Sequence, residues 1–187
     1  MAEQTRLTDD EGAPLYTIGH STRSLDELVH LLQANDVAHL FDVRRFPNSR
    51  RHPHVNEGNL ETELPRAGID YTHREVLGGR RSPPAEDSPN DAWEAEGFIA
   101  YADHAQTEAF RDALDDVLAR ADELAPQAHA CVMCAEAVYV RCHRRIISDH
   151  AHARGHPVYH IHDDDNVQRH EPPDFARIRE DDVLYPA

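Results

Sequence analysis

Short apolar segments alternate with helical segments along this chain, and that alternation constrains its fold more than any other feature. Apolar runs that are typical of strands occupy residues 15–18, 39–43, 69–73, 128–134 and 158–162. Helical periodicity begins at Ser24 and returns at about residues 57–65, 108–124 and 142–154. The pattern predicts a single-domain, layered α/β fold with a mostly parallel central sheet flanked by helices.

Local signals mark the ends of several elements. Ser24 opens the first helix, and Glu27 three residues later completes a capping box. Pro65 predicts a kink or an end in the second helix, and Gly155 suits the cap after the last one. Residues 78–91 hold two glycines and three prolines, so a long loop is expected there.

The chain has 187 residues, which suits one hydrophobic core. We expect an acidic N-terminal lead over residues 1–13, the α/β domain over residues 14–165 and an acidic C-terminal segment over residues 166–187. No apolar stretch approaches the ~20 residues of a membrane span, and no apolar signal core is visible. These features predict a soluble, cytoplasmic protein.

All 19 basic residues are arginine, against 35 acidic residues, and the formal net charge is -16. This acidity argues against a protein that binds nucleic acid non-specifically through a positively charged surface. Carboxylates without lysine are typical of a halophilic protein, adapted to concentrated salt, although the codons of a GC-rich genome would also favour arginine.

The arginines gather where predicted strands end. Four lie between residues 43 and 53, two at residues 80 and 81, and three between residues 141 and 145. The acids concentrate in residues 85–125 and 163–187, where solvated surface is expected. Ligands of open α/β sheets bind beyond the carboxyl ends of the strands, so these arginine loops are candidates for a site that takes an anion.

The first candidate loop joins the first strand to its capped helix. Unpaired N–H groups at a helix N-terminus favour an anion by about 0.3–1 kcal/mol, and small residues let a phosphate approach the backbone. A tight turn without a ligand fits the same pattern. The candidate anion-binding residues are Gly19, His20, Ser21, Thr22 and Arg23.

The second candidate loop follows the strand at residues 39–43. Asp42 ends this strand and is placed to orient an arginine, a sugar hydroxyl or a base edge. Arg44 and Arg45 come next, and the forked guanidinium group suits phosphate. An Asp–Arg ion pair that only holds the loop is an equally open alternative.

The third candidate loop carries the residues best suited to chemistry. A thiol near a helix N-terminus with cationic neighbours can have its pKa lowered from ~8.5 into roughly 3.5–7.5, the range of a nucleophilic or redox cysteine. A carboxylate at a strand end is an equally good general base or nucleophile. The predicted catalytic residues are Cys134, Glu136, Cys142 and His143, with Arg144 as an anion ligand.

Three cysteines are too few and too clustered for a disulfide framework. Cys131 and Cys134 form the Cys-x-x-Cys pattern of many zinc sites, but residues three apart on a strand point to opposite faces. His160 and His162 form a weaker candidate pair. We therefore predict no metal and no cofactor.

Together these stretches resemble a family of prokaryotic proteins known as domain of unknown function 488. The resemblance runs from about residue 14 to residue 162 and implies a compact α/β domain with these loops at one site. It also implies that cysteines recur at Cys134 and Cys142, whereas an apolar residue is usual at Cys131. The matching stretches are residues 16–28 (YTIGHSTRSLDEL), 42–50 (DVRRFPNSR), 75–81 (EVLGGRR), 133–136 (MCAE) and 142–144 (CHR).

The leading functional hypothesis is an enzyme, a hydrolase or a transferase, that acts on a phosphate-containing substrate such as a nucleotide or a nucleic-acid end. Hydrolysis, glycosyl transfer and thiol chemistry all stay open. One alternative is a non-catalytic module that binds an anion or nucleic acid. The other is a thiol or metal protein that uses Cys134, Cys142 and His143.

Overall fold

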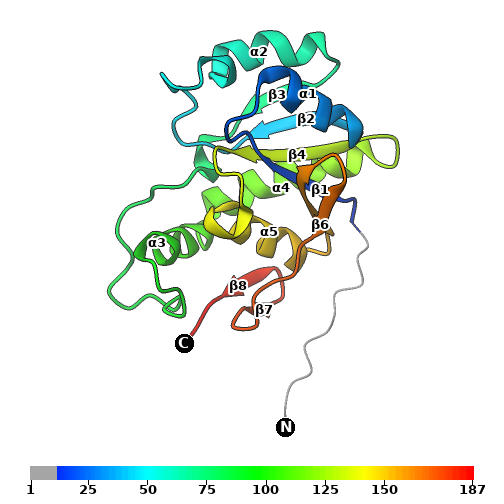
Figure 1. Cartoon of the computed structure of the whole chain (residues 1–187). Coiled ribbons are helices and arrows are strands. Elements are labelled where there is room, and N and C mark those ends of the chain that lie inside the picture. Colours follow the sequence, from blue (N-terminus) through cyan, green and yellow to red (C-terminus); the bar gives the residue numbers. More distant parts are fainter. Residues whose placement is uncertain (1–11) are drawn as a thin grey trace.

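A six-stranded sheet in the order β3-β2-β4-β1-β5-β6 forms the centre of the computed structural model, which describes residues 12–187 (Figure 1). All strand pairs in it are parallel except β5 with β6. The predicted α/β fold with a mostly parallel sheet is therefore confirmed. The strands are β1 (Leu15–Gly19), β2 (Val37–Asp42), β3 (Asp70–His73), β4 (His129–Cys134), β5 (Val158–Asp163) and β6 (Asn166–Arg169).

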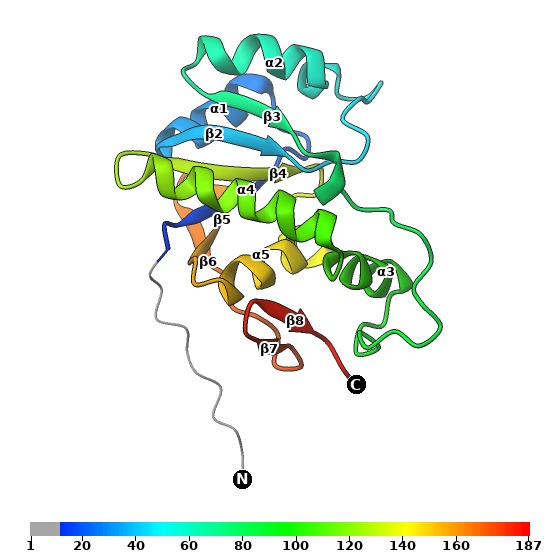
Figure 2. The ribbon, with the colours of Figure 1, turned by 180° about the vertical axis from the view of Figure 1, so that it is seen from behind.

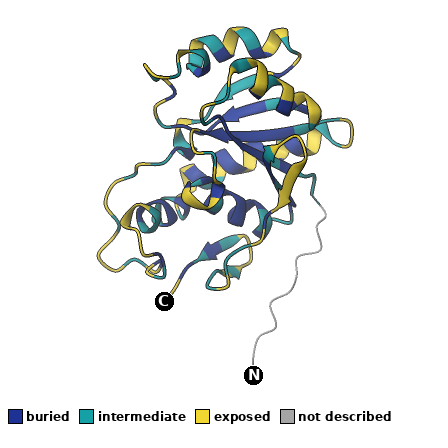
Figure 3. Cartoon of the chain, viewed as in Figure 1, coloured by how far each residue is buried: buried dark blue, intermediate teal, exposed yellow. Residues whose placement is uncertain are grey.

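Helices cover both faces of the sheet and give three layers. The apolar sides of α1 (Leu25–Ala34) and α2 (Glu57–Arg66) pack on one face. The other face carries α3 (Glu96–Ala105), α4 (Glu108–Leu124) and α5 (Arg144–Ala153), and α4 crosses in front of the sheet in Figure 2. Strands β1, β2, β4 and β5 are mostly buried between these layers, while the edge strand β6 and the outer helix surfaces are exposed (Figure 3).

Side chains along β4 alternate between the two cores. Cys131 and Met133 pack with α1 and α2, whereas Val132 and Cys134 pack with α4 and α5. The prediction that Cys131 and Cys134 point to opposite faces is confirmed. Only Cys134 of these two therefore faces the same side of the sheet as the start of α5.

The predicted boundary signals are present. The Ser24 hydroxyl accepts from the Glu27 N–H over 3.1 Å, and the Glu27 carboxylate accepts from the Ser24 N–H over 2.7 Å. Pro65 lies one residue before the end of α2, and Gly155 follows α5 with a φ of 81°. The glycine thus occupies a left-handed conformation that other residues adopt at a cost.

Two parts of the fold depart from the sequence prediction. Helix α3 was not predicted, because it starts after Ala95 without a side-chain cap and contains a glycine. The C-terminal segment is more than an acidic tail: β6 pairs at the sheet edge, and β7 (Arg177–Arg179) forms a hairpin with β8 (Asp182–Leu184). Val183 and Tyr185 are fully buried, so this segment completes the core around α5.

A short 3-10 helix follows each of the strands β2, β3 and β4: η1 (Pro53–Val55), η2 (Glu75–Leu77) and η3 (Tyr139–Arg141), respectively. Neighbouring strands β2 and β4 lead to helices on opposite faces of the sheet. Such a reversal leaves a crevice between the two end loops, where ligands of α/β proteins bind.

Within residues 12–187, no helix has the length and apolar character needed to cross a membrane.

Candidate active site

A pocket of about 670 Å³ opens at the carboxyl ends of β2 and β4. Its volume is in the range of small-molecule sites. The loop after β2, the end of β4 and the start of α5 form its base, and the loop before α3 closes one side. The lining residues are Arg44, Arg45, Phe46, Asn48, Gly79, Arg80, Ala95, Gly97, Phe98, Tyr101, Cys134, Ala135, Glu136, Arg141, Cys142 and His143.

The pocket unites the second and third candidate loops but not the first. Arg44, Arg45, Cys134, Glu136, Cys142 and His143 all line it. Asp42 and Arg144 lie directly behind lining residues and contact them. The loop of residues 19–23 is not part of the lining.

Cys134 and Cys142 lie side by side in this pocket, with their sulfur atoms 2.7 Å apart. Both are free thiols that are almost completely buried. Burial and the hydrogen bond with Cys142 raise the pKa of Cys134 well above its ordinary value. Burial would raise the pKa of Cys142 too, but hydrogen bonds from Cys134 and His143 and the charge of Arg144 outweigh it and hold the pKa well below the ordinary value. These opposite directions favour the proton on Cys134 and the negative charge on Cys142 when the pair holds one proton.

His143 has a ring orientation fixed by the backbone. Its Nε2 lies 3.0 Å from the carbonyl oxygen of Val43 and must donate to it, because a carbonyl oxygen accepts only. The Nδ1 atom lies 3.6 Å from the Cys142 sulfur. The Tyr101 ring packs 5.1 Å from the imidazole, centre to centre. His143 is thus placed to exchange a proton with Cys142.

Arg144 is the side chain that holds the thiol pair electrostatically. It is only 1% exposed, and its Nε donates to the Cys134 sulfur over 3.0 Å. Its NH2 donates to the carbonyl of Glu136 over 2.6 Å. Among residues 12–187, no carboxylate forms an ion pair with it. Burial alone lowers the pKa of the guanidinium, but the charges of the two cysteines beside it raise the pKa overall. The side chains beside Arg144 that can carry a negative charge are therefore the two cysteines.

Behind Arg144, a chain of hydrogen bonds with one direction crosses the core. The Nη1 of Arg144 donates to the Thr17 hydroxyl over 3.1 Å, and this hydroxyl lies 2.6 Å from Nδ1 of His160. The direction is set from the far end, where Asp149 only accepts: with one proton on each imidazole, Nδ1 of His160 accepts from Thr17. Nε2 of His160 then donates to Nδ1 of His170 over 2.9 Å, and Nε2 of His170 donates to Asp149 over 2.7 Å. Each donor in this chain thus has an acceptor, and the chain fixes the position of the Arg144 side chain.

The far end of this chain is closed by the C-terminal segment. The Tyr185 hydroxyl donates to the second carboxylate oxygen of Asp149 over 2.7 Å. Burial, together with the charge of Arg144, lowers the pKa of His160 to about 2. The imidazole is therefore neutral, as the directed chain requires. His160 is occupied by this chain and is not available with His162 as a metal pair.

Asp42 and Arg44 form the ion pair that the sequence left as an alternative to ligand binding. Nε and NH2 of Arg44 donate to the two oxygens of Asp42 over 2.8 and 2.6 Å. The Tyr71 hydroxyl donates to Asp42 as well, and NH2 of Arg44 reaches the Val55 carbonyl. Arg44 contributes to the pocket wall, but most of its donors are already used.

The first candidate loop is engaged by β4. The N–H groups of His20 and Ser21 donate to the carbonyls of Cys134 and Ala135, so they are not free for an anion. A Cβ atom on Gly19 would lie 1.8 Å from the Glu136 carbonyl oxygen. The glycine is therefore needed for the close crossing of two backbone segments. Arg23 donates to the carbonyls of Gly19 and His162, and Thr22 is exposed at the surface.

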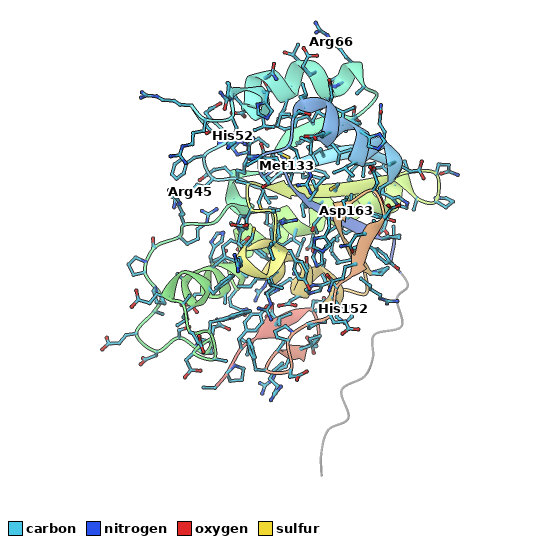
Figure 4. All side chains as sticks on the ribbon, in the orientation of Figure 1. Arg45, His52, Arg66, Met133, His152 and Asp163 are labelled. Carbon is cyan, nitrogen blue, oxygen red and sulfur yellow. The ribbon has the colours of Figure 1, made fainter. Side chains whose placement is uncertain are left out.

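The positive charge at the pocket comes from Arg45, which is a predicted anion ligand, and from two arginines that the sequence analysis places in arginine clusters without assigning them to the site. Arg80 and Arg141 are exposed lining residues, and Arg45 donates to the Arg80 carbonyl. Figure 4 shows the Arg45 side chain at the edge of the molecule, beyond the carboxyl ends of the strands. Phe46 beside it is 64% exposed and lies under the Arg45 guanidinium, 5.5 Å from ring centre to Cζ.

Several lining residues were missed by sequence reasoning. Arg80 and Arg141 belong to arginine clusters that the charge map had found, so a signal for them existed. Phe98 and Tyr101 come from α3, which was not predicted. Glu136 was predicted as a catalytic carboxylate, and its side chain is exposed and accepts from the Val138 N–H.

No three His, Cys, Asp or Glu side chains within the described residues converge as metal ligands do. Cys134, Cys142 and His143 lie together, but their contacts are mutual and with Arg144. The structure therefore gives no support to the zinc alternative.

A protein-family model of the domain of unknown function DUF488 matches residues 24–151. The chain belongs to this family. The matched segment runs from the cap of α1 to α5, so the DUF488 region contains most of the pocket lining, including both cysteines. No curated protein and no solved structure matches the chain.

Proposed function

We propose that this protein is a cysteine-dependent enzyme that acts on a phosphate-containing substrate, a nucleotide or a nucleic-acid end. The observation that carries the proposal is the burial of Arg144 against two thiols without a carboxylate partner. Taking a charge into the core costs several kcal/mol unless it is compensated. Here the compensation is a thiolate, which is the nucleophilic form of cysteine.

Within the proposal each residue has one task. Cys142 attacks the substrate, because the thiolate lies on it. His143 carries protons to and from the reacting atoms through Nδ1. Arg144 keeps the pair ionised and takes no part in binding, since it is enclosed by protein. The sequence assigned Arg144 to the anion, and the proposal moves that role outward.

Substrate binding is assigned to the exposed rim. Arg45, Arg80 and Arg141 line the pocket, and a guanidinium group suits phosphate oxygens. Phe46 offers a flat apolar ring on which a base can stack, worth about 1–3 kcal/mol.

The first test is the rate at which each cysteine is alkylated by iodoacetamide near neutral pH. Cys142 should react first, and Cys131 should be inert because burial raises its pKa. Trypsin separates the two, since it cuts after Arg141 and Arg144 and leaves Cys142 in a peptide of its own. Equal rates at the two cysteines would refute a catalytic thiolate and favour the non-catalytic binding module.

The second test is protection of Cys142 from alkylation by ligands. A nucleoside monophosphate or a short single strand with a terminal phosphate should slow the reaction. The double variant Arg80→Gln with Arg141→Gln should lose that protection. Arg66→Gln is the matched control, because Arg66 pairs with Glu63 on the surface of α2. If alkylation of Cys142 is fast but neither ligand slows it, the reactive thiolate is supported and the phosphate-containing substrate is refuted.

A further inference from the structure

The nucleophilic role described above needs one thiol, but the pocket holds two. Cys134 and Cys142 are both free and both line the pocket, and their sulfur atoms are 2.7 Å apart. A disulfide bond is ~2.05 Å long. Closing the gap therefore needs an approach of about 0.7 Å, which is a small side-chain adjustment.

We infer that this pair carries out thiol–disulfide exchange with a small anionic disulfide, with Cys142 as the attacking and Cys134 as the resolving thiol. The inference rests on the Cys142 thiolate of the proposed function and not on its phosphate substrate. It adds an activity in which the enzyme itself is oxidised.

The first step forms a mixed disulfide. The Cys142 thiolate attacks one sulfur of the substrate R–S–S–R′, the Cys142–S–R bond forms and the S–S bond of the substrate breaks. The electron pair leaves with the R′ sulfur as a thiolate. His143, whose Nδ1 lies 3.6 Å from the Cys142 sulfur, passes that thiolate a proton and regains one from water.

The second step releases the other half of the substrate. Cys134 attacks the sulfur of Cys142, the Cys134–Cys142 bond forms, and the R sulfur leaves with the proton that Cys134 gives up. The substrate has gained two electrons and has become two thiols, and the protein dithiol has become a disulfide. A second, low-molecular-weight thiol reduces the protein again by the reverse steps.

The position of Arg144 favours Cys134 as the resolving residue. Its Nε already donates to the Cys134 sulfur over 3.0 Å, so the negative charge that develops there during the second step is stabilised in place. Cys131 is excluded from this chemistry, because it lies on the opposite face of β4 in the other core.

The charge of the rim selects the substrate. Arg45, Arg80 and Arg141 line the pocket beside one carboxylate, Glu136, and an excess of positive charge at an opening raises the encounter rate of anions by a factor of about ten or more. Dithiodipropionate and cystamine are disulfides of similar size with carboxylate and ammonium ends, respectively. We expect the protein to react with dithiodipropionate about tenfold faster than with cystamine.

The experiment treats the reduced Cys131→Ala protein with dithiodipropionate and analyses it by mass spectrometry, without reduction, before and after trypsin. Cys131→Ala removes the one other thiol, so any cross-link found joins Cys134 to Cys142. The expected product is lighter by two hydrogen atoms, carries no substrate arm, and has residues 142–144 linked to the peptide that contains Cys134. Adding Cys134→Ser should stop the reaction at the mixed disulfide on Cys142.

Two results would overturn the inference while leaving the proposed thiolate intact. One is a stable mixed disulfide on Cys142 in the protein that still has Cys134. The other is no reaction with dithiodipropionate although iodoacetamide alkylates Cys142 rapidly. If iodoacetamide does not modify Cys142 either, the proposed function fails together with the inference. The Cys131→Ala protein, which keeps both pocket thiols, carries the decisive measurement, so a misfolded Cys134→Ser variant does not remove the test.

Discussion

The guanidinium of Arg144 donates from Nε to the sulfur of Cys134 over 3.0 Å, and both side chains are almost completely buried. A cation held this close acts on the whole thiol pair, because the sulfur atoms of Cys134 and Cys142 are only 2.7 Å apart. The protonation of two cysteines in the pocket is thus tied to one side chain that the substrate does not touch.

Replacing Arg144 should therefore raise the pKa of Cys142. In Arg144→Gln the rate of alkylation should fall by about tenfold for each unit by which the pKa of Cys142 comes to exceed the pH of the assay. Arg145→Gln is the control, because the Arg145 guanidinium stacks 4.9 Å from the Trp93 ring centre. The pH dependence of the alkylation rate reports the pKa directly. An unchanged pH profile in folded Arg144→Gln would show that Arg144 does not set the thiolate.

Thr17 should contribute to stability through the directed chain. Thr17→Val takes the acceptor from Arg144 NH1 and the donor from His160 Nδ1, and both partners are buried. A buried polar group left without a partner costs about 1–3 kcal/mol. Urea unfolding should show a loss of about 2 kcal/mol. Thr22→Val, at an exposed position, should change stability by less than about 0.5 kcal/mol. Equal effects of the two substitutions would mean that the chain holds nothing in place.

Much of the fold follows from local signals, and so does half of the site. The Ser24 capping box and the 3.6-residue period of α4 are properties of neighbouring residues, so the sequence predicts them. The ends of β2 and β4 meet because parallel neighbours end at the same edge. For that reason Arg44, Cys134 and Cys142 are predictable as one cluster.

The other half depends on contacts between distant segments. Nothing near Gly19 in the sequence reveals that the backbone of Glu136 crosses it. The sequence predicts Arg144 as an anion ligand, because nothing near it reveals the contact with Thr17, which lies 127 residues away in the chain. The sequence does not predict the part of the pocket wall that α3 forms, since that helix has no side-chain cap.

Gly19 offers a direct test of the crossing. An added methyl group would lie 1.8 Å from the Glu136 carbonyl oxygen, which cannot move without breaking its hydrogen bond to Arg144. Gly19→Ala should destabilise the protein by about 3 kcal/mol or more. Gly58→Ala is the matched control, because nothing lies within 4 Å of its added Cβ in α2, and it should stabilise by about 0.5–1 kcal/mol. A neutral Gly19→Ala would revive the anion-loop interpretation.

The net charge of -16 predicts a strong salt dependence. Self-repulsion among carboxylates destabilises the compact state, and at molar salt the screening length falls to about 3 Å. The melting temperature should therefore rise as potassium chloride is added, and the rise should continue at molar concentrations if the acidic surface is an adaptation to salt. A melting temperature that is flat in salt would favour codon usage as the origin of the missing lysines.

His150 should make the protein sensitive to acid. Its ring packs against Phe110 at 5.4 Å, and neither ring nitrogen has a hydrogen-bond partner among the described residues. Burial, with the charges of Arg154 and Arg111, lowers the pKa of His150 to about 3 from an ordinary value of 6.5. Between these two values the unfolded chain binds a proton that the folded protein does not. Stability therefore falls as the pH drops below about 6.5.

His150→Leu removes this contribution and also the unpaired polar ring. The variant should be more stable than the parent by about 1–3 kcal/mol near neutral pH. The difference should widen by about 2 kcal/mol at about pH 5, because the parent alone pays the protonation penalty at this position. Urea unfolding of both proteins at the two pH values measures the change. A constant difference would mean that the His150 imidazole takes up its proton in the folded protein as readily as in the unfolded chain.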